Sequence, residues 1–168
     1  MSFSIHSSAF VDEGEIPRRY TGEGENISPP LSWGALPRGA KESVLICIDS
    51  DPRMTKPWIH WLLYKIPIGI HDLNEGMPRR GVIEEPARML QGRNSWGNIG
   101  YEGPLPHFED EWHTYHFKLL ALGTELSVGA ALEYDDLIRA INGHICGQVE
   151  ILGKYQRLME HPFQAVNL

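Results

Sequence analysis

Residues 49–61, DSDPRMTKPWIHW, place ionisable groups among large apolar side chains. Asp49 and Asp51 are carboxylates, and His60 is an imidazole flanked by bulky residues. A strand that only fills a core has no use for an ionisable ring, whereas a site for a charged molecule does. A carboxylate beside a histidine favours the imidazolium, which is a good partner for phosphate or carboxylate oxygens. The stretch therefore indicates a site that binds a charged molecule.

A second set of such groups lies in WHTYHFKLLAL, residues 112–122. Because side chains alternate between the faces of a strand, His113 and Tyr115 should project side by side, roughly 6–7 Å apart. The same alternation predicts one shared face for each of three sets: Trp58, His60, Leu62 and Tyr64; His113, Tyr115, Phe117 and Leu119; Trp112, Thr114 and His116.

The elements that must position these groups are mostly strands. Four segments are apolar and rich in β-branched or aromatic residues, and the sequence predicts strands at 43–49, 58–67, 112–122 and 145–155. Residues 133–144 space their apolar side chains at helical intervals and predict one helix, with Gly143 as its C-terminal stop. The long Pro- and Gly-rich segments 22–39 and 92–111 are expected to be functional loops.

Composition bounds the class of protein. The 168 residues favour one domain, 1–168, with a core large enough to be stable without disulfide bonds or bound metals. A formal charge of −7 argues against nucleic-acid binding and against docking on anionic lipid. No signal peptide or membrane span is visible, and Cys47 and Cys146 are expected to be buried free thiols, so we expect a soluble cytoplasmic protein.

The usual catalytic motifs are absent. The chain has no G-x-S-x-G elbow, phosphate-binding P-loop, H-E-x-x-H helix or dinucleotide-binding glycine pattern. Asp49, His60 and His113 nevertheless leave a hydrolase or metalloenzyme open, because two histidines and a carboxylate can hold zinc with an open position. The other histidines are assigned no role: His6, His71, His107, His116, His144 and His161.

Five collinear segments between about residues 10 and 157 resemble the phosphatidylethanolamine-binding protein family, in particular its prokaryotic, Raf-kinase-inhibitor-like branch. They are GENISPPLSW, DSDP with WIHW and IP, GRNSWGNIGYEGPLP, WHTYHF with LAL, and GHICGQVEILGKYQR. The resemblance implies a mostly β fold, with a large central sheet, a smaller sheet packed against it and a few peripheral helices.

The resemblance also implies a small anion pocket. Its residues would be Asp49, Asp51, Trp58, His60, Gly103, Pro104, His113 and Tyr115. Tyr115 would donate a hydrogen bond, and backbone amides of the Gly103 loop would line the rim. The acidic run Glu109, Asp110 and Glu111 lies close to the expected mouth and would repel an anionic ligand.

The family resemblance further implies a cis peptide bond just before the pocket strand. The sequence places Lys56–Pro57 there, and proline lowers the cost of the cis isomer to about 0.5–1 kcal/mol. We therefore expect this bond to be cis.

These inferences favour a regulatory, non-catalytic protein that binds a small phosphate-like or carboxylate anion, without a cofactor or metal. A protein kinase or a protease is the expected class of protein partner, through inhibition. An interaction scaffold with a vestigial pocket is a further alternative, and the choice between monomer and homodimer stays open.

Overall fold

The computed structural model describes residues 2–51, 53–106 and 111–157. Its main element is a seven-stranded sheet with the order β2-β10-β9-β4-β5-β8-β7. Four long strands form the middle of this sheet: β4 (Glu42–Asp49), β5 (Trp58–Pro67), β9 (Trp112–Leu122) and β10 (Ile145–Gln156). Its short strands are β2 (Gly14–Glu15), β7 (Val82–Ile83) and β8 (Met89–Gln91). All neighbours pair antiparallel except β2 with β10.

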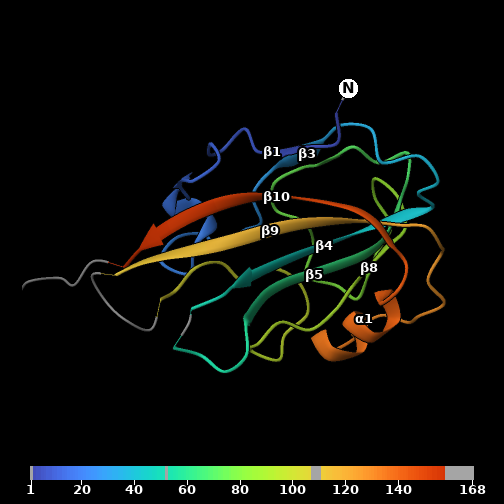
Figure 1. Cartoon of the computed structure of the whole chain (residues 1–168). Coiled ribbons are helices and arrows are strands. Elements are labelled where there is room, and N and C mark those ends of the chain that lie inside the picture. The colour runs from blue at the N-terminus through green and yellow to red at the C-terminus, as the bar shows by residue number, and fades with distance from the viewer. Residues whose placement is uncertain (1, 52, 107–110, 158–168) are drawn as a thin grey trace, which may run out of the picture.

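Two layers cover the two faces of this sheet (Figure 1). On one side lies a three-stranded sheet of β1 (Ile5–His6), β3 (Leu31–Trp33) and β6 (Asp72–Leu73). On the other side lies helix α1 (Tyr134–Ile141). The inter-sheet core includes Trp61, Tyr115 and Phe117, whereas the helix-side core includes Ile48 and Ile59.

The predicted mostly β architecture with two packed sheets is confirmed. All four predicted strands are present with nearly the predicted bounds, because each is a long run rich in apolar, β-branched or aromatic residues. The predicted helix is also present. Asp135 and Asp136 occupy its first turn, and Gly143 follows its end with φ +82°. Besides α1, the helical content of the described chain is a 3₁₀ turn at Arg18–Tyr20.

The predicted cis bond at Lys56–Pro57 is wrong. Within the described residues the cis peptide bond joins Glu85 to Pro86, and the bond before Pro57 is not cis. Trans is the more stable isomer of an X–Pro bond by about 0.5–1 kcal/mol, and a proline just before a strand is compatible with it.

The cysteine prediction is half correct. Both thiols are free and Cys47 is buried, but Cys146 is exposed. Cys146 lies beside the irregularity in pairing at Ile145 and Gly147, where β10 begins and its side chains are largely exposed. The apolar run around Cys146 therefore extends beyond the part of β10 that the core covers.

We expect iodoacetamide to modify Cys146 in the native protein and to spare Cys47 until the chain unfolds. Burial shields Cys47 and raises the pKa of its thiol, and the thiolate is the reactive form. Intact-mass spectrometry before and after addition of urea should show one adduct and then two. Two adducts in the native state would contradict the burial of Cys47.

Within the described residues, no helix is both long and apolar enough to cross a membrane.

Candidate functional site

The end of β4 and the start of β9 bring a carboxylate and an imidazole together. Asp49 pairs with Tyr115 in the β4–β9 register, so Asp49 and His113 lie near one another on the same face. His113 Nδ1 is 2.7 Å from Asp49 Oδ2, and both side chains are buried. Burial raises the pKa of Asp49, and the hydrogen bond with His113 opposes this shift. The pair fixes the orientation of the His113 ring.

The other nitrogen of His113 has no such partner. Its Nε2 is buried and makes no hydrogen bond to any of the described residues. Asp51 Oδ2 lies 3.7 Å away, beyond hydrogen-bond distance. Since a buried imidazole nitrogen without a partner is costly, this atom is suited to meet a group from outside the chain.

Arg53 holds Asp51 at the mouth of the site. Its guanidinium contacts both Asp51 oxygens, with Nη2 2.7 Å from Oδ2, and the Arg53 amide donates to Oδ1 at 2.9 Å. These bonds lower the pKa of Asp51 to about 2. Glu111 Oε2 is 2.6 Å from Arg53 Nη2, so this member of the predicted acidic run forms an ion pair with Arg53. Glu109 and Asp110 lie outside the described residues.

Aromatic rings connect the two predicted histidines. Tyr115 stacks beside His113 with ring centroids 6.4 Å apart, close to the predicted spacing, and meets His60 edge-on at 5.0 Å. Trp96 contacts both His60 and Trp58 edge-on, at 5.2 and 5.3 Å. Burial raises the pKa of Tyr115, so its hydroxyl stays protonated. Asp49, His113, Tyr115 and His60 are therefore contiguous.

The prediction that His60 shares one face of β5 with Trp58, Leu62 and Tyr64 is wrong in part. Ile48 pairs with Ile59 and Cys47 with Trp61, so His60 is an extra residue that shifts the alternation. His60 contacts Tyr115 on the inter-sheet side, whereas Leu62 and Tyr64 belong to the helix-side core. The predicted faces of β9 are confirmed, with His113, Tyr115, Phe117 and Leu119 buried together.

Gly103 and Pro104 play a different part from the one expected. The Gly103 amide donates to Asn26 Oδ1 at 2.7 Å, so this amide already has an acceptor within the chain. The Pro104 carbonyl accepts from the Gly22 amide at 2.8 Å. In the same loop, the Glu102 carbonyl oxygen accepts a hydrogen bond from His60 Nδ1 at 2.6 Å. The loop thus holds His60 and is itself anchored on residues 22–26.

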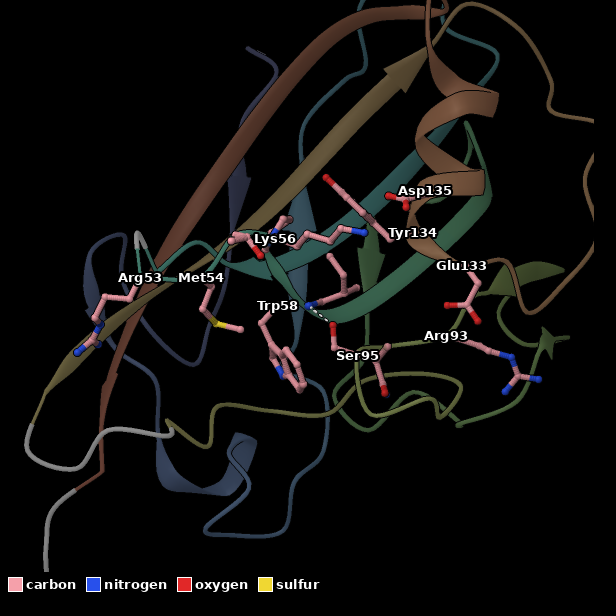
Figure 2. Close-up of a pocket in the computed structure, with 13 residues that line it drawn as sticks. Arg53, Met54, Lys56, Trp58, Arg93, Ser95, Glu133, Tyr134 and Asp135 are labelled. Atoms are coloured by element: carbon pink, nitrogen blue, oxygen red, sulfur yellow. Dashed lines mark hydrogen bonds between the residues drawn. The ribbon is translucent and has the colours of Figure 1, made fainter.

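Two cavities open near the cluster. One, of about 330 Å³, is lined by Asp49, Ser50, Asp51, Arg53, Trp112, His113 and Thr114. The larger, of about 630 Å³, lies between the 53–57 loop and the start of α1, and Lys56 extends from that loop toward Tyr134 (Figure 2). Trp58 lines the larger cavity, while His60 and Tyr115 line neither and support the site from behind.

The metalloenzyme alternative receives no support from the geometry. Within the described residues, no three His, Cys, Asp or Glu side chains form a group that could hold a metal ion. His60 Nδ1 is occupied by the Glu102 carbonyl, and the ring of Tyr115 contacts the rings of both His60 and His113.

Sequence reasoning missed three contributors to the site: Arg53, Trp96 and Glu102. Trp96 and Glu102 lie in the 92–111 segment, whose length and Gly content marked it as a functional loop. Arg53 stands two residues after Asp51, which is the signal that could have suggested their ion pair.

We expect Asp49→Asn to raise the free energy of unfolding at pH 7. An acid whose pKa is raised by folding destabilises the folded state once it ionises, and this penalty grows as the pH rises above about 4. Asparagine retains an oxygen that accepts from His113 but carries no charge. Urea unfolding at pH 7 and pH 4 measures the increase in the free energy of unfolding over the parent, which should be smaller at pH 4. A gain that is absent at pH 7 would contradict the prediction.

Comparison with known proteins gives consistent results. Residues 6–156 match the phosphatidylethanolamine-binding protein family. A UPF0098 protein of Methanothermobacter thermautotrophicus is 41% identical over 154 residues, which span 92% of this chain and 99% of the relative. The crystal structure of a putative phosphatidylethanolamine-binding protein homologue from Chlamydia trachomatis aligns with a TM-score of 0.80 at 35% identity, covering 93% and 98% of the two chains. YbcL of E. coli, described as a new member of the mammalian family, aligns with a TM-score of 0.84 at 28% identity, covering 93% and 99%.

Proposed function

The chain belongs to the phosphatidylethanolamine-binding protein family, and we propose that it binds a small phosphate-like or carboxylate anion against His113. The proposed anion site comprises Asp49, Asp51, Arg53 and His113, with Tyr115, His60 and Trp58 behind them. The anion is held and released there without covalent chemistry, so this site is a binding site rather than a catalytic centre.

The observation that carries the proposal is the buried His113 Nε2 without a hydrogen-bond partner in the described chain. Leaving such a group unsatisfied costs about 1–3 kcal/mol, which a bound acceptor would recover. His113 lines the cavity of about 330 Å³, and its ring is already oriented by Asp49. An anionic oxygen in that cavity completes the hydrogen bonding of the imidazole.

The charges around the cavity set the conditions for binding. Asp49, Asp51 and Glu111 oppose an anion, while Arg53 and a protonated His113 attract it. Because an imidazolium donates from both nitrogens, a protonated His113 can bind Asp49 and the anion at the same time. Sulfate is a suitable probe, since its own charge does not change near neutral pH.

The proposal extends to a regulatory role. The family is named for binding a phospholipid whose head group contains a phosphate, so phosphoethanolamine is a natural test ligand. A phosphate or carboxylate on a protein kinase or protease has the same chemistry, and inhibition of such an enzyme is the role we propose. The cytoplasm is the proposed location, supported by two cysteines that are both unpaired.

Thermal unfolding with added ligands tests the proposed function. Sulfate, phosphate and phosphoethanolamine should each raise Tm more than sodium chloride does at equal ionic strength, because a ligand that binds only the folded chain stabilises it. An increase no greater than that with sodium chloride would contradict the anion site. An increase with zinc alone would favour the metalloenzyme alternative.

A further inference from the structure

A row of three hydrogen-bonded side chains crosses the other face of the large sheet. Ser50 Oγ is 3.1 Å from His116 Nε2, and His116 Nδ1 is 3.1 Å from Glu150 Oε2. Ser50 and Glu150 are exposed, and His116 is partly exposed. One imidazole thus connects a hydroxyl on one nitrogen with a carboxylate on the other.

Three adjacent strands build this row. Ser50 follows the end of β4, His116 belongs to β9, and Glu150 belongs to β10 next to it. Ile48 pairs with His116, and Lys118 pairs with Glu150, so all three side chains project from the helix-side face. His113 and Tyr115 alternate with His116 along β9 and project from the opposite face. His116 and Glu150 therefore lie on the opposite face from His113, whereas Ser50 also lines the cavity of about 330 Å³ of the proposed anion site.

The arrangement has the connectivity of a serine nucleophile, its base and the group that orients the base. With a proton on Nδ1 donated to Glu150, the Nε2 lone pair accepts the hydroxyl proton of Ser50. We propose that Ser50 and His116 are catalytic residues that hydrolyse a carboxylic ester, with Glu150 as the positioning residue.

The reaction balances without any further reactant except water. Ser50 Oγ forms a bond to the acyl carbon, its proton passes to His116 Nε2, and the ester C–O bond breaks as that proton goes to the leaving alcohol. Water then attacks the acyl group and gives one proton to Nε2. The acid departs, and the proton returns to Ser50. Glu150 accepts the hydrogen bond from Nδ1 throughout and keeps that proton in place.

The neighbouring surface indicates the substrate class. Ile48 is the β4 partner of both His116 and Ile59, so His116 and Ile59 lie on one face about 10 Å apart across two strand spacings. Ile59 lines the cavity of about 630 Å³, together with Met54, Trp58 and Tyr134 (Figure 2). These walls are suited to the apolar part of an ester, and we infer an ester with an apolar acyl group as the substrate.

Covalent labelling of the full chain tests the proposal. A fluorophosphonate should form an Oγ–P bond with release of fluoride, and peptide mapping should place the adduct on Ser50. p-Nitrophenyl butyrate should be hydrolysed by the same protein. Ser50→Ala should abolish labelling and lower hydrolysis by about 100-fold or more, whereas Ser127→Ala, at another exposed serine, should change neither.

The histidine and glutamate variants separate catalysis from folding. His116→Gln should abolish labelling while His144→Gln leaves it intact. Glu150→Gln should lower kcat about 10-fold or more with little change in KM, and Glu150→Asp should restore part of the loss. Absence of an adduct, an adduct on another residue, or equal hydrolysis by Ser50→Ala would overturn the proposal. Exposed imidazoles hydrolyse activated esters on their own, and the Ser50→Ala comparison identifies that background.

Discussion

Gly103→Ala should lower the free energy of unfolding by about 2–4 kcal/mol, the upper range for forcing an extra group into a packed site. A β-carbon at this position would overlap the Tyr20 carbonyl oxygen and press on the Thr21 backbone. That segment cannot easily move aside, because the Tyr101 hydroxyl donates to the Tyr20 carbonyl at 2.5 Å and Thr21 is fully buried. The substitution should also displace the loop that holds His60.

Urea unfolding of Gly103→Ala and Gly69→Ala provides the matched comparison. An alanine β-carbon at Gly69 would meet no atom within 4 Å, so that variant should stay within about 0.5 kcal/mol of the parent. A cost below about 1 kcal/mol at Gly103 would show that the loop and residues 20–26 yield more readily than their contacts indicate.

Replacement of His113 should have the largest effect on ligand binding, and two substitutions divide its functions. Asparagine places an amide near the position of Nδ1, so His113→Asn should keep the hydrogen bond to Asp49 and lose the donor at Nε2. Glutamine reaches the position of Nε2 and should keep part of the binding. We expect His113→Asn to weaken sulfate binding about 10- to 100-fold, the value of a hydrogen bond to a charged group, and His113→Gln to weaken it less.

Sulfate-dependent shifts in Tm give both affinities, with His71→Asn as the control at an exposed histidine. Equal binding by His113→Asn and the parent would place the anion elsewhere. A loss of binding in the His71 variant would indicate a nonspecific effect of charge.

The strands and the faces of β9 followed from the sequence because apolar, β-branched and aromatic runs determine them locally. The orientation of His60 did not, because it depends on a bulge that appears only when β5 is paired with β4. The exposure of Cys146 likewise depends on how far the core extends along β10. Neither property is encoded by the residues adjacent in the chain.

The residues of the site likewise divide into those that the sequence predicted and those that depend on contacts between distant segments. Alternation on one strand predicted that His113 and Tyr115 are neighbours, residues 49–61 indicated Asp49, and family resemblance added Gly103. The hydrogen bond of the Gly103 amide depends on Asn26, which is distant in sequence. The Ser50–His116–Glu150 row was missed for a related reason: it joins three separate strands and contains no nucleophile motif. Single-strand patterns carry no information about such cross-strand contacts.

The most direct test of the proposed anion site follows the imidazole nitrogens of His113 by NMR, in protein labelled with ¹⁵N-histidine and titrated with sulfate at constant pH and ionic strength. The proposal predicts a saturable shift of His113 Nε2 below about 10 mM sulfate, with the resonances of the exposed His71 and His144 unchanged. His113 signals that stay fixed throughout the titration, or that move only in step with those of His71 and His144, would contradict it.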